Sequence, residues 1–178
     1  VSYDEIYNLM THYRKFVLGG SPLFGVGNNT TLSTLGSCFV VDSPEDSYGG
    51  IFRADQELAQ LMKRRGGVGI DISSLMPNKA YVNNAASSST GAVSFMHRFS
   101  NTTREVAQEG RRGALLITMD IYHKDIHDFI TAKDDLTKIT GANISVKITD
   151  KFMKAVENGS EYCKTTWNKL IHQAWKTA

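Results

Sequence analysis

Residues 68–72 read Val-Gly-Ile-Asp-Ile, a short run of mostly β-branched apolar side chains that follows two glycines. Such a run predicts a buried β-strand. A helical pattern ends just before it near Gly66, and a second helical pattern begins at Thr90. A strand between two helices is typical of βαβ units, whose strands run parallel.

The same alternation continues on both sides of this strand. A capping-box pattern at Ser2 predicts a first helix that continues to Val17 and ends at Gly19–Pro22. Ser43 is the expected N-cap of a helix that runs to Arg65 with Gly66 as its stop. Further strands are expected at 38–41, 114–119 and 144–148, further helices at 90–107, 123–132, 152–156 and around 167–175, and a linker at 158–164. The fold class is therefore α/β, as a parallel sheet or barrel.

Composition limits the class of protein. The 178 residues are 41% hydrophobic and 21% charged, which fits one globular domain over residues 1–178. A net charge of +2 is too small to indicate a nucleic-acid or membrane partner. There is no apolar run near the roughly 20 residues of a membrane span and no signal-peptide pattern, so we expect a soluble, cytoplasmic protein. Val1 and Ala178 suggest that both ends are cut from a longer chain.

Two cysteines are present, and they form no CxxC pair. Cys38 begins an expected strand directly after Gly36-Ser37, where small neighbours leave room for a substrate. Its thiol is either a reductant or nucleophile, or a buried structural group, which is the commoner case for free cysteine. Cys163, in the expected linker, is taken as incidental.

Two glycine-containing segments have two interpretations each. Gln108–Gly113 combines two glycines with two arginines, which suits either a mobile loop that touches a nucleotide or a solvated basic turn. Arg65–Gly69 resembles a phosphate loop faintly, but it lacks the P-loop spacing and follows a helix, which favours a tight turn.

Other polar residues also leave alternatives open. Asp46 and Ser47 lie in the first turn of a predicted helix, where they either hold a ribose hydroxyl or simply cap the helix. His123 and His127 have zinc-ligand spacing, but no third ligand follows at a convincing distance, so no metal site is predicted.

The order and spacing of six segments carry more information than any of them alone. The segments are Gly36–Val41, Asp46–Ile51, Arg64–Asp71, Ser89–Met96, Gln108–Ala114 and Gly141–Lys147. From about residue 18 to the end, this set closely resembles the large, catalytic subunit of ribonucleotide reductases. The resemblance implies that the chain is the N-terminal half of a ten-stranded α/β barrel.

The resemblance also implies a chemistry. In that family a thiyl radical takes a hydrogen from the ribose 3′ carbon, the 2′ hydroxyl leaves as water, and a cysteine pair supplies the electrons. Cys38 matches the first cysteine of the pair, and thiols suit that role because dithiol and disulfide interconvert within enzyme-accessible potentials. Substrate contacts are implied for Ser21 in the phosphate-binding turn, and for Ser37, Gly67 and Arg112.

A deoxynucleotide effector site is implied as well. Residues 73–86 match the first specificity loop and residues 108–113 the second, which reports the effector's base to the substrate site. Effector contacts are implied for Asp46, Ser47, Ile51, Lys63, Met76, Gln108, Glu109, Gly110 and Arg111. Helices 44–65 and 90–107 match the family's homodimer interface.

Departures from the family pattern define what is expected of the chain alone. Met76 stands where the family often has arginine, and Lys124 replaces a common proline. The Asn-x-Cys-x-Glu segment that holds the radical cysteine and its acid/base partner is absent from the sequence, and the 158–165 junction looks shortened. The chain alone is therefore expected to be inactive and to need the C-terminal half of the catalytic subunit.

The nature of the radical source stays open from the sequence. It is either a metal-containing small subunit, which the run at residues 23–29 favours, or adenosylcobalamin. Diphosphate and triphosphate substrates both remain, with dNTP or ATP as effectors. A non-catalytic deoxynucleotide-binding and dimerisation module is the alternative function, and an unrelated α/β phosphate-binding protein is a weaker third.

Overall fold

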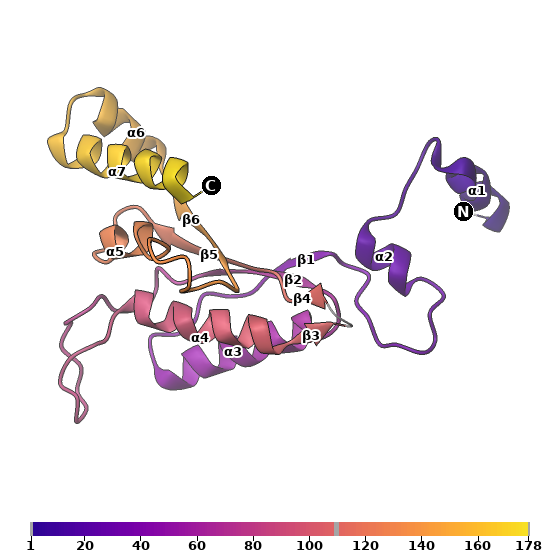
Figure 1. Ribbon diagram of the computed structural model, residues 1–178, viewed down its shortest axis with the longest axis horizontal. Helices are drawn as coiled ribbons and strands as arrows, with labels where there is room; N and C mark the ends of the chain where they lie inside the picture. The colour runs from indigo at the N-terminus through magenta and orange to yellow at the C-terminus, as the bar shows by residue number, and fades with distance from the viewer. Residues whose placement is uncertain (1, 109–110, 178) are drawn as a thin grey trace.

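The computed structural model describes residues 2–108 and 111–177. Four parallel strands form the central sheet in the order β1 (Cys38–Val40), β2 (Gly67–Asp71), β5 (Leu115–Asp120) and β6 (Asn143–Lys147). Helices α3 (Tyr48–Met62) and α4 (Ala92–Glu105) lie side by side along this sheet (Figure 1). The predicted alternation of parallel strands and helices is confirmed.

Further elements lie on both sides of this unit. A short antiparallel hairpin, β3 (Ala107–Gln108) and β4 (Arg111–Arg112), follows α4. Helices α5 (Ile126–Ile130), α6 (Asp150–Glu157) and α7 (Glu161–Thr177) pack near β5 and β6, while α1 (Tyr3–Met10), the 3₁₀ turn η1 (Thr11–Tyr13) and α2 (Gly20–Gly25) lie beyond β1 (Figure 1). No helix in the described parts of the chain has the length and apolar character of a membrane span.

The two faces of the sheet differ in chemistry because side chains alternate along a strand. In β5, Leu115, Ile117 and Met119 are buried, and they share a core with Phe99 of α4. The opposite, open face presents more exposed residues, among them Leu116 and Thr118. We call this the open face of the sheet. Helices α3 and α4 pack on the face that carries this core.

Helix α3 begins later than predicted. Its N-cap is Ser47, whose hydroxyl accepts a hydrogen bond from the N–H of Gly50 at 3.0 Å, so Ser43 as N-cap was wrong. The preceding segment is held outside the helix by the loop after β2, since the Ser74 hydroxyl donates to the carbonyl of Pro44 at 2.6 Å. A contact across 30 residues thus determines where the helix starts.

The end of α3 also differs in detail. Arg65, with a φ of 71°, takes the left-handed position that we expected Gly66 to fill. The N–H of Gly66 then donates to the carbonyl of Leu61 at 3.1 Å, which satisfies one of the last helical carbonyls.

Two further boundaries were predicted wrongly. The first helix stops at Met10 instead of Val17, because His12 and Tyr13 adopt φ values of 56° and 54°. The expected linker is mostly helix: only residues 158–160 separate α6 from α7, and Cys163 is a buried residue of α7.

Phe99 offers a test of the packing described here. It is fully buried between the helices and the sheet, so Phe99→Ala should lower the free energy of unfolding by about 3–5 kcal/mol. Phe16→Ala is the matched control, since that ring is 48% exposed and its loss should cost much less. Urea denaturation monitored by circular dichroism measures both. Equal losses would mean that Phe99 is not part of this core.

Candidate functional site

Cys38 lies on the open face of the sheet, at the amino end of β1. Its side chain is exposed, and in the parallel register it stands opposite Gly67 of β2. A Cβ atom at Gly67 would lie 3.7 Å from the sulfur, so glycine keeps the space beside the thiol clear. The interpretation of Cys38 as a structural cysteine buried among aliphatic side chains is therefore wrong.

Ser37 and Ser21 gather at the same end of the sheet. The carbonyl of Ser37 accepts a hydrogen bond from the N–H of Gly67 at 2.8 Å, and its hydroxyl lies 3.4 Å from where a Cβ of Gly19 would be. Ser21 is buried, and its hydroxyl donates to the carbonyl of Arg65 at 3.0 Å. These contacts join α2 to the beginnings of β1 and β2.

The hairpin that contains Arg112 reaches this end as well. Arg112 is two residues before Ala114, whose carbonyl accepts from the N–H of Val68 at 2.9 Å and whose Cβ would lie 3.6 Å from a Cβ at Gly67. Thus Ser21, Ser37, Cys38 and Gly67 meet at one end of the sheet, with the backbone of Arg112 close by. We call this group the thiol cluster.

A separate cavity of about 440 Å³ lies at the start of α3. Four predicted effector residues line it, namely Asp46, Ser47, Ile51 and Met76. Its remaining wall comes from neighbouring residues of α3 and α4 and from the loop after β2: Tyr48, Tyr81, Val82, Asn83, Asn84, Ser88, Ser89, Thr90 and Phe95. This volume, with aromatic walls and a few polar groups, is typical of small-molecule sites.

Hydrogen bonds fix the polar side of this cavity. The Asp46 carboxylate accepts from the N–H of Met76 at 3.1 Å, which ties the loop to the helix start. An ionised carboxylate has about four acceptor positions, so this bond leaves capacity for a ligand hydroxyl. Ser47 caps α3, so the capping interpretation holds for that residue while it also lines the cavity.

The family can now be stated from comparison. A family model described as the ribonucleotide reductase barrel domain matches residues 36–173, which include both the thiol cluster's cysteine and the cavity. The chain belongs to the ribonucleotide reductase family. This confirms the resemblance drawn from the six sequence segments.

Individual ribonucleotide reductases give the same result. The chain is 34% identical to a vitamin B12-dependent ribonucleoside-diphosphate reductase of Thermoplasma acidophilum, over 92% of this chain and 23% of that protein. It is 33% identical to a ribonucleoside-diphosphate reductase large chain of Neurospora crassa, over 89% of this chain and 17% of that protein. The chain thus spans less than a quarter of the curated relatives that it matches.

A solved structure supports the fold. The alpha subunit of a class Id ribonucleotide reductase of Actinobacillus ureae superposes with a TM-score of 0.77 at 23% identity, over 98% of this chain and 31% of that one. The described sheet is accordingly part of a ribonucleotide reductase barrel.

Lys63 is not among the described residues that line the cavity. Lys63 follows the last turn of α3, and Gln108 and Arg111 belong to the hairpin after α4. Since α3 has 15 residues, its two ends are about 22 Å apart. The predicted effector role of Lys63, Gln108 and Arg111 therefore stays a prediction. Glu109 and Gly110 lie outside the described residues.

The histidines have structural partners. His123 bonds through both ring nitrogens, to the carbonyl of Leu75 and to the N–H of Asp125, while the ring of His127 meets Tyr162 edge-on. Within residues 2–108 and 111–177, no group of three or more His, Cys, Asp or Glu side chains is placed to hold a metal ion.

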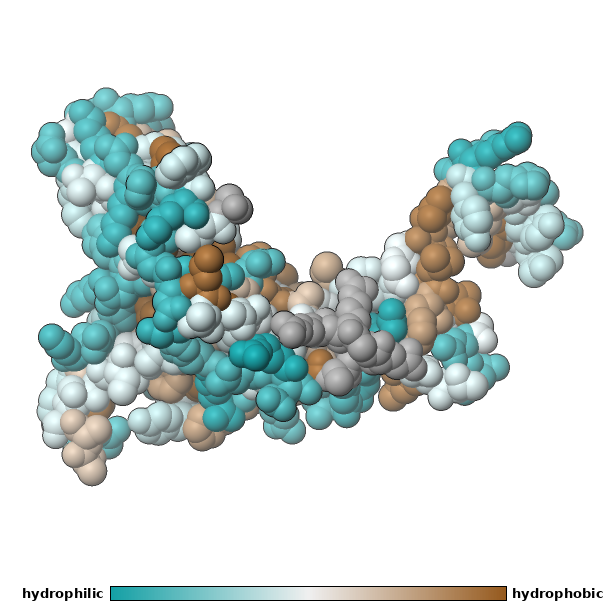
Figure 2. Space-filling view, viewed as in Figure 1, coloured by the Kyte–Doolittle hydropathy of each residue, from teal (hydrophilic) through white to brown (hydrophobic). Residues whose placement is uncertain are grey.

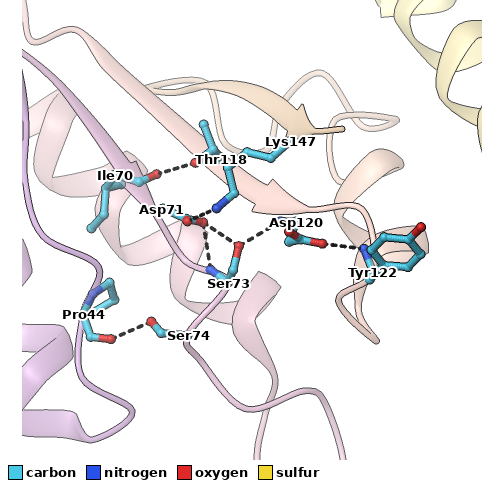
Figure 3. Close-up of polar contacts among 9 residues, drawn as sticks. All are labelled: Pro44, Ile70, Asp71, Ser73, Ser74, Thr118, Asp120, Tyr122 and Lys147. Atoms are coloured by element: carbon cyan, nitrogen blue, oxygen red, sulfur yellow. Dashed lines mark hydrogen bonds and ion pairs between the residues drawn. The ribbon is translucent and has the colours of Figure 1, made fainter. Parts of the chain in front are cut away.

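One polar group on the open face was missed by the sequence analysis. At the carboxyl ends of the strands, Asp71 of β2 forms an ion pair with Lys147 of β6 and accepts from both the hydroxyl and the N–H of Ser73 (Figure 3). The sequence did contain an indication of this group. Asp71 stands between two buried isoleucines, and because side chains alternate along a strand it must face the open side of the sheet.

The environment of Asp71 lowers its pKa. Burial acts to raise the pKa, but hydrogen bonds from Lys147 and Ser73 and the nearby ammonium charge outweigh it, so the net pKa lies below the ordinary value. A carboxyl with a lowered pKa in the folded state contributes stability above its unfolded pKa. That contribution is lost as the pH falls through the folded pKa.

Asp71→Asn should therefore lower the free energy of unfolding at pH 7, and its difference from the wild type should shrink as the pH falls below about 4. Urea denaturation over a pH series measures this. Lys147→Met should lower the free energy of unfolding with a similar pH dependence, and combining it with Asp71→Asn should lower it little further. Lys154→Met is the control, since this exposed lysine of α6 should have no such effect. A difference that is constant with pH would contradict the assigned ion pair.

Proposed function

We propose that this chain is the effector-sensing part, and one half of the reducing site, of the catalytic subunit of a ribonucleoside-diphosphate reductase. The observation that carries the proposal is the exposed Cys38 thiol on the open face of a reductase barrel sheet, with Gly67 leaving space beside it. The diphosphate substrate is inferred from the names of the relatives.

Cys38 supplies one of the two reducing thiols in this proposal. When the ribose 2′ hydroxyl leaves as water, two thiols become one disulfide and deliver two electrons and two protons, which balances the replacement of C–OH by C–H. Cys163 does not serve as the second thiol, because it is buried in α7. The second thiol and the radical cysteine come from the rest of a longer catalytic chain.

The cavity at the start of α3 is the proposed deoxynucleotide effector site. Asp46 accepts a ribose hydroxyl, and the rings of Tyr48, Tyr81 and Phe95 offer faces for a base. Among the described residues that line the cavity, none is a lysine or an arginine. The negative charge of the effector's phosphates therefore requires basic groups from elsewhere.

A homodimer resolves this requirement. Helices α3 and α4 both start at the cavity and end beside the hairpin, so Lys63, at the C-terminal end of α3, lies at the far end from the cavity. A two-fold axis perpendicular to these helices places the far end of one subunit against the cavity of the other. Lys63 of the partner subunit would then approach the phosphates.

The outer surface of the helix pair suits such an interface. Tyr48 and Phe52 are exposed by 58% and 47%, and Arg98 stacks on the Phe52 ring at 4.3 Å while it pairs with Asp55 at 2.9 Å. Exposed aromatic residues next to an arginine are typical of interface anchors.

The radical source is proposed to lie outside these residues. Two kinds were named from the sequence, adenosylcobalamin and a metal-containing small subunit. The relatives from Thermoplasma acidophilum and Mycobacterium tuberculosis are named vitamin B12-dependent, so adenosylcobalamin is the source that relatives support by name. The roles assigned to Cys38 and to the effector cavity are the same with either source.

A regulatory module without catalysis is the second candidate. The observation that favours it is that the wall of the cavity is built from this chain, whereas the thiol cluster contains only one accessible thiol among the described residues. Such a module would bind deoxynucleotides and dimerise, and Cys38 would have no role in turnover.

Replacement of Cys38 separates the two candidates. In the full-length catalytic chain, Cys38→Ser should reduce ribonucleotide turnover by about three orders of magnitude or more and leave deoxynucleotide binding unchanged. Cys163→Ala is the control and should retain turnover. Turnover that survives in Cys38→Ser, or that is measured with residues 1–178 alone, would contradict the reductase proposal.

The shared effector site is testable by mixing subunits. Asp46→Ala and Lys63→Ala should each weaken deoxynucleotide binding about tenfold or more, the scale of one hydrogen bond or ion pair to a charged group. Glu45→Ala is the matched control, since Glu45 is exposed and outside the cavity. Isothermal titration calorimetry measures the affinities.

Mixed dimers then show which subunit supplies each residue. A dimer with one Asp46→Ala and one Lys63→Ala subunit keeps one site in which both residues are intact, so about half of its sites should bind with wild-type affinity. If both residues act within one chain, mixing restores no site. That outcome would contradict the two-fold arrangement but leave the cavity's role standing.

A further inference from the structure

The turn between β5 and α5 holds the loop that forms one wall of the effector cavity. Asp125, in this turn, is 6% exposed. Its carboxylate accepts from the N–H of Asn78 at 2.9 and 3.1 Å and from the N–H of Ala92 at 3.0 Å. One buried side chain thus binds both the loop, at Asn78, and the first residue of α4, Ala92.

His123 adds a second attachment. Its Nδ1 accepts from the N–H of Asp125 at 3.0 Å, so the ring proton is on Nε2 and donates to the carbonyl of Leu75 at 2.9 Å. A third attachment is Ser73, whose hydroxyl accepts from the N–H of Asp120 at 2.8 Å (Figure 3). The end of β5 and the turn after it therefore hold the loop at Ser73, Leu75 and Asn78, and the start of α4 at Ala92.

These points bracket residues that line the cavity. Met76 lies between Leu75 and Asn78, and Thr90 is two residues before Ala92. Gly91, with a φ of 86°, lets the chain pass close to the carboxylate, since a Cβ there would be 2.8 Å from Asp125 Oδ2. Neither Asp125 nor His123 lines the cavity itself.

We propose that Asp125 is a positioning residue for effector binding. It sets the distance between the loop at Met76 and the start of α4, and His123 supports it by holding Leu75. The inference rests on the proposed function, because it assigns to Asp125 the shape of the proposed effector cavity. The alternative is that Asp125 stabilises the fold alone.

Asp125→Asn is the sharpest variant. Asparagine keeps the shape but has a single acceptor oxygen, so one of the two N–H groups would face an NH₂ donor instead of an acceptor. The loop then shifts or loosens at Asn78 or Ala92. The matched control is Asp135→Asn, at a carboxylate that accepts from the N–H of Thr137 at 3.0 Å in a turn away from the cavity.

The measurement is ribonucleotide turnover by the full-length chain with its radical source, titrated with a deoxynucleotide. For Asp125→Asn, the concentration for half-maximal effect should rise at least about tenfold, and the turnover at saturating deoxynucleotide should stay within twofold of the wild type. For Asp135→Asn, both should be unchanged. A purely structural role would lower maximal turnover with an unchanged half-effect concentration, and that result would overturn the inference.

Two further measurements keep the test decisive. Should Asp125→Asn fail to fold, His123→Ala is the second variant. It removes the hydrogen bonds to the carbonyl of Leu75 and to the N–H of Asp125, keeps the Asp125 carboxylate, and should raise the half-effect concentration about threefold. A half-effect concentration equal to that of the wild type would then overturn the inference.

If the wild type itself neither binds nor responds to any deoxynucleotide, the proposed effector site fails and the role of Asp125 fails with it. If the wild type responds to deoxynucleotide and Asp125→Asn has the same half-effect concentration, only the role of Asp125 is overturned.

Discussion

The hydrogen-bonded pairing of β2 with β5 fixes which side chains face the helices and which face the open side of the sheet. Val68 and Ile70 pair with Leu115 and Ile117, and all four are buried in the same core. Because the side-chain period of a strand is two, a shift of one residue in this register would exchange the faces. The apolar match therefore holds Gly67 and Asp71 on the open face, and the pairing of Gly67 with Cys38 then keeps the thiol there.

The parallel arrangement of α3 and α4 separates the two candidate sites. Both helices start at the cavity and end near the thiol cluster, so the chain carries the two candidate sites at opposite ends of one helix pair. Figure 2 shows that hydrophobic residues also extend over the N-terminal segment that contains α2, where Phe16, Val17 and Val26 are exposed. The N-terminal segment that contains α2 contacts the turn between α3 and β2. The Ser21 hydroxyl donates to the carbonyl of Arg65, and the Arg65 guanidinium lies 3.8 Å from the centre of the Phe24 ring.

Local patterns in the sequence were enough for the strands and for the position of Cys38. The buried runs at 68–72 and 114–119 were recognisable because each is short, mostly apolar and preceded by glycine. Helix ends were less predictable. Ser47 rather than Ser43 caps α3 because Pro44 is bonded to Ser74, a contact between distant segments that no local pattern contains. For the same reason, the resemblance implied effector contacts for both Asp46 and Lys63 but did not show that these residues stand at opposite ends of α3.

The order of the strands makes β1 and β6 the two edge strands of the sheet. The unpaired N–H and C=O groups on the outer side of an edge strand can pair with a strand of another chain. Closure of the sheet into a barrel removes its edges. β6 is the longer of the two, and its side chains alternate between exposed and half-buried. Protein limited to these residues would therefore tend to aggregate by pairing β6 with strands of neighbouring molecules. Its solubility would depend on how well this edge is covered.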